Sequence, residues 1–117
     1  EDGYSLTLLG MSKFREGDYD AAMEALSKAV QIDPNDPQTQ MYLGITLSQQ
    51  GLRKQAETAL RKAVALAPGN ATAHYNLAVV YATQQPPFPK LAEHHYNTAT
   101  ANGHPRSEEL EAMFAKE

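Results

Sequence analysis

Along most of the chain, apolar residues recur three and four positions apart, and polar residues fill the positions between them. This spacing places the apolar side chains on one face of an α-helix, and it breaks where glycine or proline occurs. No stretch alternates between apolar and polar residues for long enough to indicate a β-strand. The pattern therefore predicts an all-α protein, with helices over residues 3–16, 19–32, 37–50, 53–66, 71–84 and 89–102.

Polar residues at the predicted helix starts support these boundaries. Asp36 precedes Pro37, which is the arrangement of an N-cap followed by proline at the first helical position, where its missing N–H group costs nothing. Asp18 and Asn70 stand at the starts of two other helices, and their side chains can cap those helices in the same way.

A short seventh helix is predicted over about residues 106–116. Ser107 can act as its N-cap, and two glutamates follow in the first turn, where they suit the positive end of the helix dipole. Leu110, Met113 and Phe114 share one face, and we expect this face to cover the apolar side of the 89–102 helix.

The chain repeats itself at an interval of 34 residues. Residues 6–36 and 40–70 are identical at ten of 31 positions, where chance would give about two, so a structural repeat explains the match. The aligned sets include Leu9 with Leu43 and Leu77, Gly10 with Gly44, Gly17 with Gly51, Ala22 with Ala56, Leu26 with Leu60, and Pro34 with Pro68.

The third copy departs from this interval within the segment "QQPPFPK" at residues 84–90. After it, Ala92, Tyr96 and Ala99 follow their counterparts in the second copy at a spacing of 36. The segment also satisfies the loose proline pattern that aromatic-lined grooves read, since Pro86 and Pro89 are three apart. We favour an enlarged turn between two helices, because the two-residue insertion already accounts for the prolines.

These features resemble the tetratricopeptide-repeat family. The resemblance rests on "LLGMSKFREGDYDAAMEALSKAVQIDPND" and "YLGITLSQQGLRKQAETALRKAVALAPGN", in which the small residue after Leu, the turn glycine, and the later Ala, Leu, Ala and Pro stand at the family's intervals. It departs from the family pattern at residues 85–90 and in the early aromatic of the first helix, which is missing. The resemblance implies one domain over residues 1–117: helical hairpins at about 3–36, 37–70 and 71–104 and a capping helix, stacked as a right-handed solenoid.

For function, the resemblance implies a scaffold that binds a partner protein or peptide through its concave groove, without enzymatic activity. Two alternatives remain open: a module for homo-oligomerisation, and an accessory domain of a larger protein. One class of the family holds a terminal carboxylate with Lys, Asn and Arg residues on the first helices. No cation stands at the matching positions here, so charge-assisted capture of a carboxylate is not available; those positions hold Thr7, Met11, Tyr42, Thr72 and Asn76.

The first helices of the three repeats carry a second apolar face. On a helical wheel with about 100° per residue, Leu47 lies beside Leu43, whereas Met41 and Ile45 lie on the opposite side. First helices line the concave side of a stacked array, so we expect this face to form a largely exposed binding strip. A competing interpretation is that neighbouring repeats bury part of it. We call these six residues the inner strip: Met11, Phe14, Met41, Ile45, Tyr75 and Val79.

Composition narrows the classes of partner. The net charge is −4, the pI is about 5.5, and the 10 Lys and Arg residues are scattered, which argues against nucleic acid as a partner. No apolar run approaches the roughly 20 residues that span a bilayer, so we expect no membrane insertion. The first residue is Glu1, so we expect that a leader or flanking segment has been removed. The low charge, the lack of cysteine and the abundance of Gln, Thr and Asn are compatible with a bacterial exported or periplasmic protein.

Candidate chemistry is sparse. The absence of cysteine excludes disulfides and thiol catalysis. His94 and His95 are adjacent on a helix, so their side chains point about 100° apart and do not readily chelate one ion, while His74 and His104 lie in other elements. The sequence contains no nucleophile elbow, phosphate-binding glycine loop or metal-protease motif. We therefore expect no metal site, no cofactor and no enzymatic activity.

Overall fold

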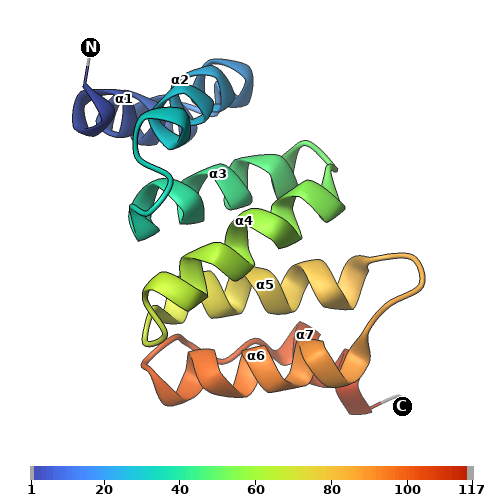
Figure 1. Cartoon of the computed structure of the whole chain (residues 1–117). Helices are drawn as coiled ribbons and strands as arrows, with labels where there is room; N and C mark the ends of the chain where they lie inside the picture. The colour runs from blue at the N-terminus through green and yellow to red at the C-terminus, as the bar shows by residue number, and fades with distance from the viewer. Residues whose placement is uncertain (1, 116–117) are drawn as a thin grey trace.

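A computed structural model describes residues 2–115, and its helices follow the predicted pattern closely (Figure 1). The first six helices begin where predicted and end within one residue of the predicted end, and the described residues contain no strand, which confirms the all-α class. The predicted end of the seventh helix, at residue 116, lies outside the described residues. The helices are α1 (Gly3–Arg15), α2 (Tyr19–Ile32), α3 (Pro37–Gln49), α4 (Arg53–Leu66), α5 (Ala71–Thr83), α6 (Pro89–Ala101) and α7 (Glu108–Ala115).

The predicted N-caps are in place. The side chains of Asp18, Asp36 and Asn70 accept hydrogen bonds from backbone N–H groups two or three residues further along. At the start of α7, the hydroxyl of Ser107 accepts from the N–H group of Leu110 at 3.2 Å. Each cap satisfies a donor in the first helical turn that has no partner within the helix.

Helices pair as hairpins, α1 with α2, α3 with α4, and α5 with α6 (Figure 1). Glycine lets the first two pairs approach closely. A Cβ atom at Gly10 would lie 2.4 Å from Cγ of Leu26, and one at Gly44 would lie 2.6 Å from Cγ of Leu60. The third hairpin has Ala78 at this position, fully buried.

The hairpins stack into an array 47 Å long and 25 × 21 Å across. The second helix of each of the first two hairpins packs against the first helix of the next, and the first helices also contact one another: α1 with α3, α3 with α5, and α5 with α7. The second helices do not approach one another to a comparable extent, so the first helices form the inner layer of the stack. One cluster of buried apolar side chains runs from α3 to α6, and Phe14 and Met23 extend it to the first hairpin.

Two glutamines that cap the C-termini of first helices link each repeat to the one before it. The side-chain amide of Gln50 donates to Asp20 of α2 at 2.7 Å. That of Gln84 donates to Glu57 of α4 at 3.3 Å. The two glutamines are 34 residues apart, so the donor repeats, while the acceptors Asp20 and Glu57 stand at different positions of the repeat.

The seventh helix closes the end of the stack. Leu110 is buried against Ala78 of α5 and Tyr96 of α6, and the ring of Phe114 lies 5.5 Å from that of Tyr96. The helix thus covers part of α6, as predicted, and also packs against α5. None of the helices within residues 2–115 is long and apolar enough to cross a membrane.

A polar contact fixes the start of α7. The guanidinium of Arg106 donates two hydrogen bonds of 2.8 Å to Glu111, and the hydroxyl of Tyr96 donates to the same carboxylate. The N–H group of Ser107 donates to the Tyr96 hydroxyl at 2.8 Å. Hydrogen bonds from Arg106 and Tyr96 lower the pKa of Glu111 to about 2, so this carboxylate stays ionised through the neutral and mildly acidic range.

The segment at residues 84–88 is the turn between α5 and α6, as predicted from the insertion. The N–H group of Phe88 donates to the carbonyl of Tyr81 at 2.9 Å, and the two rings meet edge to face with centroids 6.0 Å apart. The side chain of Phe88 is nevertheless 45% exposed. The longer turn therefore lifts an aromatic side chain out of the packed array.

Candidate partner-binding face

The inner layer of first helices is the candidate binding face, and it buries the predicted inner strip more than expected. Met41 and Ile45 are 7% and 8% exposed, and both belong to the main apolar cluster. The expectation of a largely exposed strip is wrong for these two residues. Met11, Phe14, Tyr75 and Val79 are partly buried.

Neighbouring elements cover the ends of the strip. The ring of Phe14 lies 5.9 Å from that of Tyr42 on α3, in an edge-to-face arrangement. The ring of Tyr75 stacks on His104 with centroids 3.9 Å apart, and Val79 packs against the cluster that contains Leu110 of α7. A first helix needs one apolar face for its hairpin partner and a second for the first helix that follows. Phe14 of the inner strip makes this second contact.

Other residues of the first helices lie opposite the hairpin partner. Gly10 and Gly44 face the second helices, and a residue two positions earlier lies about 200° around the helix. That position holds Leu8, Tyr42 and Asn76 in the three repeats, and the residue four positions before each shares its face. We call these six residues the inner row: Tyr4, Leu8, Gln38, Tyr42, Thr72 and Asn76.

The inner row is uncharged at neutral pH and open to solvent to different degrees. Tyr4 is 72% exposed and Leu8 is 46% exposed, while Tyr42 and Asn76 are partly exposed. The side-chain amide of Asn76 donates to the carbonyl of Thr72 at 2.9 Å, and its own side-chain oxygen remains able to accept a hydrogen bond. The row offers aromatic, aliphatic and amide groups for contact. In the sequence, the row can be located from the small residue that meets the partner helix, because one of its members stands two positions before that residue.

The structure also brings together two histidines that the sequence analysis placed in separate elements. Nδ1 of His74 on α5 lies 3.0 Å from Nδ1 of His95 on α6. Nε2 of His74 lies 2.8 Å from the carbonyl oxygen of Pro68, which can only accept, so Nε2 carries a proton. When His74 is neutral, its Nδ1 is therefore an acceptor, and His95 donates to it.

The bond from His74 has a counterpart in the second repeat, where the side-chain amide of Gln40 donates to the carbonyl of Pro34 at 2.9 Å. Gln40 and His74 are 34 residues apart, so the ring of His74 makes the hydrogen bond that a glutamine amide makes at the equivalent position of the second repeat. Within residues 2–115, no group of three or more His, Cys, Asp or Glu side chains is arranged to hold a metal ion. The absence of a metal site remains a prediction.

Burial lowers the pKa of His95 to about 4, and the charges of His74, His94 on α6 and Arg61 on α4 act in the same direction. The ring also stacks on Tyr81 of α5, with centroids 5.7 Å apart. Each of the elements around His95 therefore presents either an apolar surface or a group that opposes a positive charge. The folded protein keeps this imidazole neutral.

This arrangement predicts that acid destabilises the fold. Between pH 6.5, the ordinary pKa of histidine, and about pH 4, the unfolded chain binds a proton at residue 95 that the folded protein excludes. The contribution of His95 is therefore complete above pH 6.5 and falls as the pH is lowered through this window. We expect the melting temperature, followed by circular dichroism, to drop on acidification, and to drop less in His95→Gln.

The matched control is His94→Gln, because His94 is the exposed neighbour on the same helix. It should keep most of the pH dependence of the parent protein, because it leaves the burial of His95, the largest cause of the lowered pKa, in place. An equal pH dependence in His95→Gln and the parent would show that the His74–His95 contact does not exclude a proton.

Comparisons with known proteins agree with this architecture. Models of the tetratricopeptide repeat match residues 13–63 and 43–85, which together span more than half of the chain. The type IV pilus assembly protein PilF of Pseudomonas aeruginosa is 43% identical over 62 residues, which are 53% of this chain and 24% of that protein. The match thus spans about a quarter of that relative.

Solved structures show the same fold over nearly the whole chain. The first TPR domain of Spaghetti (RPAP3), bound to the HSP90 peptide SRMEEVD, has a TM-score of 0.82 at 22% identity and covers 98% of this chain and 89% of its own. YrrB, a TPR protein with an unusual peptide-binding site, has a TM-score of 0.79 at 23% identity and covers 100% of this chain and 58% of its own. The 34-residue period, the stacked hairpins and these matches show that the chain belongs to the tetratricopeptide-repeat family.

Proposed function

We propose that this chain is a non-enzymatic interaction module that binds a peptide segment of a partner protein along the inner row. The observation that carries the proposal is the uncharged, partly exposed row itself, in which Leu8 and Tyr42 occupy equivalent positions on consecutive first helices. Peptide binding by structural relatives such as the RPAP3 domain supports it. The net charge of −4 favours a protein over a nucleic acid as partner.

The chemistry of the inner row indicates the kind of segment it accepts. Asn76 and the hydroxyl of Tyr42 can hydrogen-bond to peptide groups, and the side chains of Tyr4 and Leu8 can cover apolar residues. No cation stands in the row to pair with a carboxylate. The segment bound there is therefore uncharged and contains apolar side chains, which distinguishes it from an acidic tail such as SRMEEVD.

The inner strip supports this surface. Met41 and Ile45 are packed into the main apolar cluster beneath the row, so they hold the first helices in register. Met11 and Val79, which are partly buried, border the row at its two ends. We propose that these two residues touch a bound segment at their exposed atoms, while the rest of the strip acts through packing.

The test compares Leu8→Glu with Leu9→Glu. The two leucines are adjacent on α1 and are 46% and 44% exposed, but only Leu8 belongs to the inner row. A peptide selected from a displayed random library against the parent protein serves as the probe. We expect Leu8→Glu to weaken its binding by at least about tenfold in fluorescence polarisation, and Leu9→Glu to leave it unchanged. Both variants should melt within a few degrees of the parent, because exposed substitutions usually cost about 0.5 kcal/mol or less.

A larger effect of Leu9→Glu than of Leu8→Glu would favour self-association instead. Leu77 is fully buried, whereas its equivalent Leu9 is exposed, and Ile32 at the end of α2 is 54% exposed. If these side chains join two copies, light scattering at two concentrations will show a dimer that Leu9→Glu converts to a monomer. A parent protein that is monomeric at both concentrations would exclude this alternative.

A further inference from the structure

An open cleft of about 550 Å³ lies away from the inner row, on the edge of the array where the turns within hairpins meet. Figure 1 shows the turn between α3 and α4 and the turn between α5 and α6 on the same side of the stack. The first turns of α4 form one wall of the cleft, and the turn at residues 84–88 forms the other. Its lining residues include Arg53, Lys54, Glu57, Gln84, Pro86 and Phe88.

The wall formed by α4 is positively charged. Nε of Arg53 donates to the hydroxyl of Thr83 at 3.1 Å, which fixes the guanidinium group and leaves its terminal N–H groups available. Lys54 is its exposed neighbour on the helix. Neither cation forms an ion pair with a carboxylate in the part of the chain that the structure describes.

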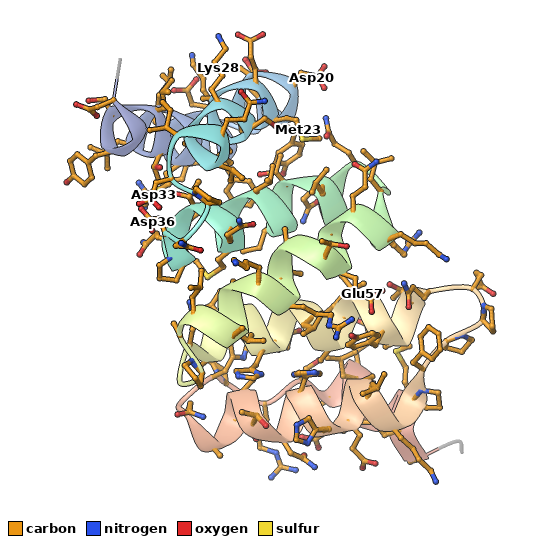
Figure 2. The ribbon with its side chains drawn as sticks, viewed as in Figure 1. Asp20, Met23, Lys28, Asp33, Asp36 and Glu57 are labelled. Atoms are coloured by element: carbon orange, nitrogen blue, oxygen red, sulfur yellow. The ribbon has the colours of Figure 1, made fainter. Side chains whose placement is uncertain are left out.

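Glu57, which is labelled in Figure 2, is the acidic residue in the lining, and it forms a hydrogen bond within the protein. Its carboxylate accepts from the side-chain amide of Gln84 at 3.3 Å. Burial, together with the nearby carboxylate of Glu57, raises the pKa of Tyr81 to about 12. Arg53 and Lys54 outnumber this carboxylate, so the lining of the cleft carries a net positive charge.

The backbone adds to this positive character. The N-cap of α4 is Leu52, which has no side chain to accept from the first helical turn, whereas α1, α2, α3 and α5 are capped by Asp or Asn. The N–H groups at the start of α4 thus have no side-chain acceptor next to the two cations. A carboxylate at this end of the cleft would be favoured by both.

The opposite wall is apolar. Phe88 is 45% exposed and its ring is supported by Tyr81, so it presents a fixed aromatic surface. Pro86 also lines the cleft, while Leu91, also 45% exposed, lies outside the cleft and lines a neighbouring hollow together with Phe88. This wall is formed by the turn that contains the two-residue insertion of the third repeat. The insertion is not part of the inner row.

We propose that this cleft is a second binding site, for an acidic segment of a partner protein that carries an apolar side chain next to its carboxylate. The carboxylate pairs with Arg53 and Lys54, and the apolar side chain packs on Phe88 and Pro86. The complementary charge of the unpaired cations commits the site to an acidic segment, in contrast to the uncharged segment proposed for the inner row. The two sites can therefore be tested separately.

The probe is a fluorescein-labelled peptide of alternating glutamate and phenylalanine, blocked at both ends so that it has no terminal carboxylate. We expect it to bind the parent protein at least about tenfold more tightly than the same peptide with glutamine in place of glutamate. Arg53→Glu combined with Lys54→Glu should abolish the difference, and Phe88→Ser should weaken the binding of both peptides. Circular dichroism will confirm that each variant is folded.

The matched control is Arg61→Glu combined with Lys62→Glu, which makes the same change of net charge on the same helix but outside the cleft. This pair and Leu8→Glu should retain the binding of the glutamate peptide within about threefold. Equal losses in the two charge-reversal pairs would show general attraction to a basic helix and would overturn the proposal. Loss of binding in Leu8→Glu alone would place the peptide on the inner row, and retained binding in all variants would equally refute the site.

Discussion

Ile45→Glu is expected to unfold the protein at temperatures where the parent is stable. Ile45 is 8% exposed and packs within the main apolar cluster, so a glutamate there would be a buried charge without a partner. Such a group costs about 3–5 kcal/mol, a large part of the roughly 5–15 kcal/mol that stabilises a typical domain. We expect the melting temperature to fall by more than about 10 °C in calorimetry.

The same substitution at Leu8 provides the comparison, because Leu8 is 46% exposed on the inner row. Leu8→Glu should melt within a few degrees of the parent. If Ile45→Glu instead kept its melting temperature and lost a partner, the inner strip would be an open groove and the packing described above would be incorrect.

Removal of residues 106–117 is expected to cost several kcal/mol of stability. The deletion takes away Leu110, which is 5% exposed, and the partly buried Met113 and Phe114. Burial of such side chains contributes about 1.5–3 kcal/mol each when complete. It would also expose Tyr96 and remove the carboxylate of Glu111 to which its hydroxyl donates. We expect a lower melting temperature and aggregation, measured by calorimetry and light scattering.

Single substitutions in α7 distinguish the effect of its apolar packing from the effect of removing the segment. Leu110→Ala should reproduce much of the effect, at about 2–5 kcal/mol, because it leaves a cavity between α5, α6 and α7. Glu109→Ala, on the exposed side of the same helix, should change stability little. A truncated protein that stays monomeric and equally stable would mean that α7 is a passive extension.

The helices and their caps were predictable because they depend on local sequence. Asp18, Asp36 and Asn70 act on backbone groups within three residues, and the 34-residue interval identifies equivalent turns. The insertion at residues 84–90 was also visible, since it shifts the register of everything after it. Local chemistry and periodicity thus account for the fold.

The binding face was less predictable, because periodicity does not say which neighbour covers an apolar face. The helical wheel placed Ile45 on a second apolar face, but it did not show that this residue would be buried in the main apolar cluster. Tyr42, Thr72 and Asn76 of the inner row were named only as positions that lack a cation, and the row as a whole gave no pattern because its residues differ in polarity between repeats. Equivalent position in the three repeats would have identified the inner row, whereas a search for hydrophobic residues at that position would not.

The contact between His74 and His95 illustrates a different limit. The two residues are 21 positions apart, and their distance depends on how α5 and α6 are aligned across the enlarged turn. Sequence spacing alone gives no alignment once the repeat interval is broken. The counterpart of His74 in the second repeat, Gln40, was a usable clue, because it makes the same bond to a proline carbonyl.

The glutamine links between repeats determine how the array loses its structure. Gln50 and Gln84 each join the end of a first helix to the preceding hairpin, so separating two hairpins exchanges a hydrogen bond between an amide and a carboxylate for hydrogen bonds to water. In a linear array, stability is the sum of each unit's own stability and of the interfaces between neighbours. The two glutamine hydrogen bonds strengthen the interfaces between neighbouring hairpins. They therefore disfavour states in which a single hairpin is unfolded. We expect these hydrogen bonds to make the melting of the array more cooperative than apolar contacts alone would, and to resist separation of the terminal hairpin under a force applied through a bound partner.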